Sequence, residues 1–171
     1  VLVDDIGLES SKSEILSQLY SASKGVPPDI TRITGIDSSM LVGMPHISEH
    51  VKYIQDRVDR ADILVAHNAP FDIRCLEACG VNFIGKEVFD TATHAKRMLP
   101  DLEKHTMSNM TSHLNIVNED AHRAIYDVKA MIEAYLILTD KDKYGSQLKE
   151  LTKKHKKLTY TKVIKKPKVK K

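Results

Sequence analysis

Cysteine is scarce in this 171-residue chain: only Cys75 and Cys79 are present, and both fall in one expected helix. A single Cys-x-x-x-Cys without a second pair is weak support for a zinc site. Reduced, buried thiols in a reducing, cytoplasmic compartment are therefore expected. No apolar run approaches the length of a membrane span, and no signal peptide is expected. The chain also lacks an internal repeat and a glycine-rich phosphate loop, which argues against a solenoid and a P-loop site.

Charge is divided unevenly along the chain. Residues 141–171 carry 13 lysines and two acidic residues, whereas residues 1–140 carry a net charge of −8 within the overall +3. We expect one domain over residues 1–140 and a lysine-rich tail over residues 141–171. An acidic body is common in enzymes whose carboxylates hold metal ions, and a basic tail suits phosphate backbones. A merely solvated tail is the alternative, and the two readings are compatible.

Apolar periodicity predicts strands that alternate with helices. Strands are expected at residues 1–3, 14–22, 62–66 and 88–91. Helices are expected at residues 47–58, 73–79, 92–99, 106–114 and 124–138, with a short helical turn at residues 30–36. The last helix has an expected buried stripe of Ile125, Val128, Ile132, Tyr135 and Leu136. This alternation predicts an α/β fold with helices on both sides of one sheet.

The chain is organised around residues 62–72. An apolar run at residues 62–66 is too short for a helix and rich in β-branched residues, which predicts a buried strand. A polar turn follows, and Asp72 then stands at the head of a helix that Gly80 closes. A carboxylate thus lies where a strand gives way to a helix, a place where α/β folds commonly put chemistry. Taken alone, Asp72 is better explained as a helix N-cap, and a second acidic site far downstream is what favours the chemical role.

A second candidate site lies at the start of the last helix. His122 lies at or just before the helix start, and Asp127 lies in its second turn. If His122 is still in the preceding loop, both side chains can point into one cleft. Asp127 borders the expected buried stripe, where a carboxylate is costly unless it is paired, hydrogen-bonded or bound to a metal. A capping histidine and an exposed aspartate remain the alternative.

Five ordered blocks resemble the DEDDh 3′→5′ exonucleases, which include proofreading subunits and domains of bacterial DNA polymerases, RNase T and oligoribonuclease. The blocks are residues 28–36, 65–72, 89–91, 105–116 and 122–127. Their order and spacing hold from about residue 14 to residue 139. The resemblance implies a ribonuclease-H-like mixed β-sheet flanked by helices. It also implies metal-dependent removal of nucleotides from the 3′ end of single-stranded DNA or RNA, with proofreading beside a DNA polymerase subunit among the family's roles.

The resemblance also assigns the chemistry to individual residues. Asp72 and Asp127 would bind two Mg²⁺ or Mn²⁺ ions, which would stabilise the attacking and the leaving oxygen of the scissile phosphate. His122 would be the general base that takes a proton from the attacking water. An imidazole suits this role because its pKa lies near neutrality.

Other residues would shape the substrate site in the same family. Asn68 and Phe71 would form the surroundings of Asp72, and Asp90 would brace the fold rather than bind metal. The last nucleotide would be contacted by three residues of one turn, Thr34, Gly35 and Ile36. This contact would favour a free or frayed single strand over a paired duplex.

The family's first motif, an Asp-x-Glu on a central strand, is not found. The only Asp-x-Glu is at residues 101–103, in a loop between two expected helices, and we interpret it as a coincidence. Residues 1–20 match the family's second and third strands, and Val1 is not a methionine. We therefore expect the first strand to lie upstream of Val1. Two explanations remain beside this one. The chain is an inactive relative that binds nucleic acid or a polymerase, or Asp4 or Asp5 replaces the lost carboxylates.

A missing first strand has a structural consequence. In the family this strand lies in the middle of the sheet, between the strand near Val1 and the strand at residues 62–66. Its loss would leave unpaired backbone groups in the core. We therefore expect these 171 residues to be poorly stable alone unless a partner chain supplies a strand.

Overall fold

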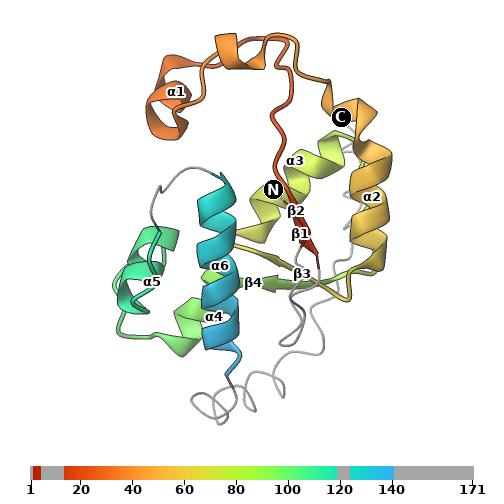
Figure 1. Ribbon diagram of the computed structural model, residues 1–171. Helices are drawn as coiled ribbons and strands as arrows, with labels where there is room; N and C mark the ends of the chain where they lie inside the picture. Colours follow the sequence, from red (N-terminus) through yellow and green to blue (C-terminus); the bar gives the residue numbers. More distant parts are fainter. Residues whose placement is uncertain (1, 5–13, 119–123, 141–171) are drawn as a thin grey trace, which may run out of the picture.

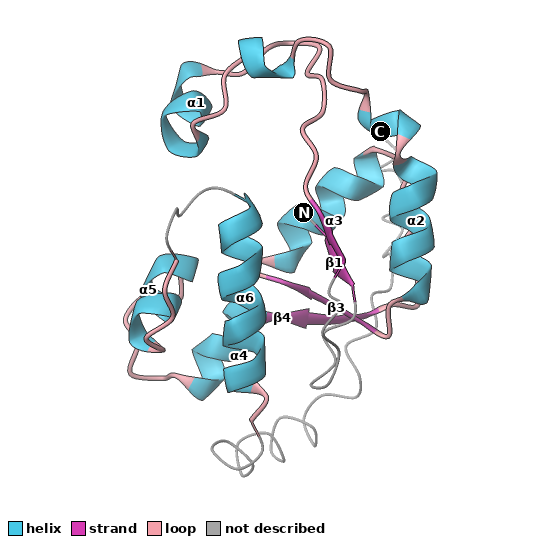
Figure 2. Cartoon of the chain, viewed as in Figure 1, coloured by secondary structure: helices cyan, strands magenta, loops and turns pink. Residues whose placement is uncertain are grey.

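The computed structural model describes residues 2–4, 14–118 and 124–140. Helices and short strands alternate along them (Figures 1 and 2). The elements are β1 (Leu2–Asp4), β2 (Glu14–Leu16), α1 (Pro28–Thr34), η1 (Ser39–Leu41), η2 (Ile47–Glu49), α2 (Val51–Arg60), β3 (Ile63–Ala66), α3 (Ala69–Ala78), β4 (Glu87–Asp90), α4 (Thr91–Met98), α5 (Met107–His113) and α6 (Ala124–Leu138). The predicted α/β class is confirmed. His122, Asp5 and the lysine tail lie outside the described residues.

The four strands form two separate pairs. β3 and β4 are parallel, with Leu64 opposite Val88. β1 and β2 are antiparallel, with Leu2 opposite Leu16. Within the described ranges no strand joins the two pairs, so the parallel and antiparallel pairings lie in two two-stranded sheets. This arrangement agrees with the gap expected beside residues 62–66.

Strand β3 is less buried than its apolar sequence predicted. Ile63 is 41% exposed, and the other three residues of the strand are only partly buried. Apolar strands become buried when other strands and helices cover both of their faces and edges. Among the residues described here β3 pairs with β4 alone. The prediction of a buried strand is therefore wrong, and the strand keeps an apolar surface.

The parallel pair β3–β4 separates two hydrophobic clusters. Neighbouring residues of a strand point to opposite faces, and accordingly Val88 packs against one cluster and Phe89 against the other. The first cluster, under α2 and α3, contains Ile54, Val58, Ala69, Ile73, Val81 and Phe83. The second cluster, between α4, α5 and α6, contains Ala95, Met98, Leu99, Met110, Ile116, Ala130, Ala134 and Leu138. The result is three layers, helices, strands and helices (Figure 1).

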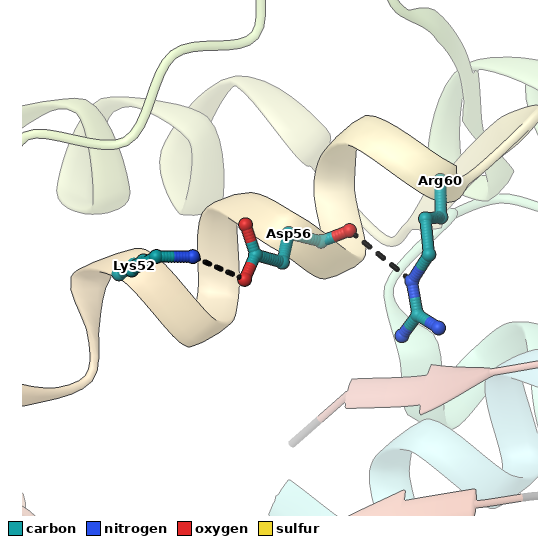
Figure 3. A network of polar contacts seen from close by, with 3 residues as sticks. All are labelled: Lys52, Asp56 and Arg60. Carbon is teal, nitrogen blue, oxygen red and sulfur yellow. Dashed lines mark hydrogen bonds and ion pairs between the residues drawn. The ribbon is translucent and has the colours of Figure 1, made fainter.

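Helix α2 has the predicted amphipathic character. Ile54 and Val58, one turn apart, are both buried against the first cluster. The opposite face carries polar contacts along the helix (Figure 3), where Lys52 Nζ lies 2.9 Å from Asp56 Oδ2 and Arg60 Nε donates to the Asp56 carbonyl. Because the Lys52 and Asp56 side chains are well exposed, this ion pair contributes little to stability. Burial of the apolar face is what holds the helix in place.

The buried face of α6 differs from the predicted stripe. Leu136, which was assigned to that stripe, is 38% exposed. The buried residues of the helix are Ala130, Met131, Ala134 and Leu138. Two of them are alanines, whose small side chains let α6 approach its neighbours closely. Asp127 lies one turn before Ala130 and Met131 and is partly buried, so it lies at the border of the buried face, as expected.

Both cysteines are free thiols, Cys75 within α3 and Cys79 at its C-cap, one residue past the helix end. Ala69 and Ile73 form the buried face of the helix. Cys75 points away from that face and is exposed, and Cys79 is partly buried. The prediction of buried thiols is therefore wrong for Cys75. Among the described helices, none combines the length and the apolar character needed to cross a membrane.

Candidate active site

The carboxyl ends of β3 and β4 lie at the same edge, because the two strands are parallel. His67 and Asn68 directly follow β3, while Asp90 ends β4 and Thr91 begins α4 (Figure 1). Such an edge is where α/β folds commonly bind ligands. Four polar residues from two parts of the chain are thus brought together.

His67 connects the two strand ends. Its Nδ1 lies 3.0 Å from the hydroxyl of Thr91, and that hydroxyl donates a hydrogen bond to the carbonyl of Ala66. Thr91 is completely buried. The His67 ring also forms a hydrogen bond with the backbone of His105, in the segment before α5. The motif at residues 65–72 includes His67, but the sequence pattern assigned it no role.

The electrostatic surroundings of His67 include two carboxylates. Burial lowers the pKa of the His67 imidazole from its ordinary value of 6.5. The nearby charges of Asp90 and Asp127 and the hydrogen bond to the His105 backbone oppose this shift without reversing it. Asp127 of α6 is therefore close enough to the strand ends to act on the ring. Helix α6 also packs against β3, which makes Asp127 and the ends of β3 and β4 candidates for one site.

Asp90 braces this edge of the sheet. Its Oδ1 accepts hydrogen bonds from the backbone N–H groups of Asn68, at 2.8 Å, and Ala92, at 3.2 Å. Its Oδ2 accepts one from the hydroxyl of Thr93 at 2.7 Å. Asp90 thus caps α4 and holds the turn between β3 and α3. Both oxygens are engaged within the fold, which agrees with the expected bracing role.

Asp72 lies in the first turn of α3 and is not its N-cap. The N-cap is Asn68, in the left-handed conformation with φ 64° and ψ 48°. The capping explanation of Asp72 is therefore wrong. Partial desolvation by the surrounding atoms raises the pKa of the Asp72 carboxyl from 3.8. A hydrogen bond from its own backbone N–H opposes this rise, and the negative charge of Asp90 adds to it. Solvent nevertheless reaches the Asp72 side chain. Phe71, beside it, is 57% exposed.

Asp127 is held from the loop that follows α5. The Nδ2 of Asn118 donates a hydrogen bond to Oδ1 of Asp127 at 2.9 Å. Asp127 is partly buried, so the alternative of an exposed aspartate is wrong. The carbonyl oxygen of the Asn118 side chain is buried and has no hydrogen-bond partner among the residues described. Sequence periodicity missed Asn118 because its partner lies nine residues away in the chain.

The predicted nucleotide-contact residues form the end of α1. The Thr34 hydroxyl donates to the Ile30 carbonyl and accepts from the backbone N–H of Ile36 at 3.2 Å. Gly35 takes the left-handed conformation, φ 69°, that ends the helix. Figure 1 shows α1 apart from α3 and on the side of α6 where that helix begins. These residues are therefore held in place by local hydrogen bonds. The structure does not bring them to the polar residues around His67.

The described residues supply part of a metal site. Carboxylate oxygens are the ligands that Mg²⁺ and Mn²⁺ prefer, and Asp72 lies in the first turn of α3 and Asp127 in the first turn of α6. In residues 2–4, 14–118 and 124–140, however, no three His, Cys, Asp or Glu side chains are grouped closely enough to hold a cation. The donors present fit the ion in kind but not in number.

Comparisons with known proteins point to nucleases. The family model described as Exonuclease, RNase T, matches residues 6–135. The chain is 36% identical over 112 residues to a PolC-type DNA polymerase III of Clostridium perfringens, a match that covers 63% of this chain and 8% of that protein. It is 31% identical over 125 residues to the DNA polymerase III epsilon subunit of Treponema pallidum, covering 70% of this chain and 58% of that protein.

Two further matches extend this picture. The 3′-5′ exonuclease DinG of Staphylococcus saprophyticus is 31% identical over 120 residues, which is 68% of this chain and 13% of that protein. The chain thus spans less than two thirds of the length of these curated relatives. A solved structure of exonuclease X in complex with 5′ overhanging duplex DNA matches with a TM-score of 0.62 at 23% identity. That match covers 84% of this chain and 81% of the other, and it confirms the predicted fold.

Proposed function

This chain belongs to the RNase T exonuclease family, and from that premise we propose that it is a metal-dependent 3′→5′ exonuclease of the DEDDh type. Its substrate would be the 3′ end of single-stranded DNA or RNA. The observation that supports the proposal is the polar edge at the carboxyl ends of β3 and β4, where His67 and Asp90 lie and where the charge of Asp127 acts on the His67 ring. The relatives named PolC and epsilon support a proofreading role beside a DNA polymerase.

The proposed metal ligands are Asp72 and Asp127, together with ligands from outside the described residues. A bound Mg²⁺ or Mn²⁺ would supply stabilisation of the negative charge that develops on the scissile phosphate. The raised pKa of Asp72 fits this role, because a crowded carboxylate gains from a nearby cation. His122 would take the proton from the attacking water. His67 and Asp90 would keep the two strand ends in register around the reaction.

The strand would be bound by residues on two segments, the start of α3 and the end of α1. Phe71 is an exposed aromatic side chain next to Asp72, and such side chains bind single strands by stacking on bases. The exposed amide of Asn68 would contact the nucleotide beside it. The end of α1 would contact the last nucleotide through Thr34, Gly35 and Ile36. The hydroxyl of Thr34 already donates to a backbone carbonyl, so it is not a free donor for the nucleotide. The turn would therefore contribute to binding through its shape.

A gel assay tests the proposed activity. A 5′-labelled single strand of DNA, and in parallel one of RNA, is incubated with the chain and Mg²⁺ or Mn²⁺. We expect stepwise shortening from the 3′ end, which Asp72→Asn and Asp127→Asn reduce to background because each removes an anionic ligand. Asp101→Asn is the matched control, since Asp101 is exposed in a loop outside the site. Equal loss in this control would show a general defect instead of a lost ligand.

A catalytically silent binding module is the second candidate. It is favoured by the incomplete metal ligand set within the described part of the chain. In that case the chain would bind the labelled strand, or a polymerase, and shorten nothing in either metal. Binding that persists in Asp72→Asn and Asp127→Asn without any cleavage by the unmodified chain would support the module and overturn the enzyme.

A further inference from the structure

Asn118 is placed between two parts of the same hydrophobic cluster. Ile116, two residues earlier, is buried in the cluster formed by α4, α5 and α6, and Ala130, three residues after Asp127, is buried in it too. Across this junction Asn118 Nδ2 donates to Asp127 Oδ1 at 2.9 Å. Both ends of the hydrogen bond therefore lie within three residues of a side chain that is packed in the cluster.

The other polar atom of the Asn118 side chain is orphaned. Its Oδ1 is buried and finds no donor within the described residues. An unpaired buried acceptor destabilises a protein by roughly 1–3 kcal/mol, whereas an apolar side chain of similar size avoids that loss. Stability alone therefore does not explain an asparagine here. The side-chain amide is needed for the hydrogen bond that it donates to the carboxylate of Asp127.

We propose that Asn118 is a positioning residue, which orients the carboxylate of Asp127 for a divalent cation; this rests on the proposed function. The amide N–H fixes Oδ1 and thereby the direction of the whole carboxylate group. A neutral donor does so without adding a positive charge that would compete with the cation. Groups that orient metal ligands in this way commonly change metal affinity or activity about 10–100-fold when they are removed.

The test compares Asn118→Leu with the unmodified chain by four measurements. These are Mn²⁺ binding by electron paramagnetic resonance, kcat, KM for a labelled single strand, and the Tm. We expect weaker Mn²⁺ binding and a lower kcat, each by about 10–100-fold, with KM changed less than about two-fold. The Tm should hold or rise, because the unpaired Oδ1 of Asn118 is removed. Asn118→Ala replaces this variant if leucine prevents folding.

Asn109→Leu is the matched control, because Asn109 is a partly buried asparagine of α5. A folded Asn118→Leu chain that binds Mn²⁺ and cleaves like the unmodified chain would overturn the positioning role. A lower Tm with unchanged Mn²⁺ affinity would overturn it as well, since it would show a structural role. If the unmodified chain neither binds Mn²⁺ nor cleaves, the proposed function itself fails, and the role of Asn118 falls with it.

Discussion

The imidazole Nδ1 of His67 lies 3.0 Å from the hydroxyl of Thr91, and this contact joins the end of β3 to the start of α4. A second connection runs beside it, from the backbone N–H of Asn68 to Asp90. The two strands therefore end in a linked polar network and not in two independent loops. The position of α3, and of Asp72 in its first turn, depends on this network.

The pH dependence of stability should report the burial of His67. Its pKa lies below 6.5 in the folded chain, so the unfolded chain binds the proton more readily. The contribution of His67 is complete above the unfolded pKa and is lost as the pH falls toward the folded pKa. His67→Gln should flatten this fall between about pH 7.5 and 5.5, measured by urea unfolding. His113→Gln, an exposed histidine of α5, is the control, and an unchanged slope in His67→Gln would contradict the prediction.

Asp72→Asn should abolish nuclease activity without lowering stability. The pKa of Asp72 is raised, so its contribution to stability is complete below 3.8 and is lost as the pH rises through the folded pKa. At neutral pH the neutral amide should therefore hold or slightly raise the Tm of the metal-free chain, with a small gain because solvent reaches the side chain. Differential scanning fluorimetry measures the effect beside Asp101→Asn. A clear drop in Tm would show that Asp72 stabilises the fold.

Leu138→Ala should be costly although Leu136→Ala, on the same helix, should not be. Leu138 is fully buried in the second cluster, whereas Leu136 is 38% exposed. We expect Leu138→Ala to lower the free energy of unfolding by roughly 2–5 kcal/mol. Leu136→Ala should lower it by less than about 1 kcal/mol. Urea titration decides between this face and the predicted stripe, and similar losses at both positions would contradict the observed packing.

Because β3 pairs with β4 alone among the described strands, the isolated chain should be fragile. β3 has one strand neighbour in the described ranges, and Ile63 is 41% exposed there. We expect a low urea midpoint, and we expect the amide hydrogens of β3 to exchange faster than those of α6. Addition of a partner chain that supplies a strand should raise the midpoint. One cooperative transition at an ordinary midpoint would contradict this expectation.

The lysine tail should add affinity that salt weakens. Residues 141–171 hold 13 lysines and two acidic residues, so contacts with phosphates would release counterions. Deletion of residues 145–171 should weaken single-strand binding and flatten its dependence on salt. Fluorescence anisotropy at several salt concentrations measures both. An equal salt slope with and without the tail would show that the tail is only solvated.

Features with a local cause could be predicted from the sequence. Apolar periodicity gave the bounds of α6, residues 124–138, correctly, and the buried pair Ile54 and Val58 of α2. The buried face of α6 could not be predicted, because it depends on which helices pack against Ala130 and Ala134. The incomplete burial of β3 likewise depends on neighbouring strands that no local pattern reports.

The candidate site divides in the same way. Asp72 and Asp127 stand out as carboxylates at the starts of helices. The roles of Asn118 and His67 come from hydrogen bonds to residues nine and 24 positions away, and no spacing rule connects such pairs. The sequence predicted a role for the Asn68 side chain near Asp72. The structure adds that its backbone takes the left-handed conformation at the N-cap of α3.

The left-handed backbone conformation of Asn68 is by itself a reason for an asparagine at this position. At φ 64° the backbone admits asparagine, aspartate and glycine far more readily than other residues. The backbone conformation therefore restricts the residue types at position 68 whether or not a ligand binds there. An asparagine here is compatible with a side chain that touches nothing, so its presence in a motif is not evidence of contact. Asn68→Gly keeps the left-handed backbone conformation and deletes only the side-chain amide. This variant therefore separates a requirement for the backbone conformation from a requirement for a side-chain contact.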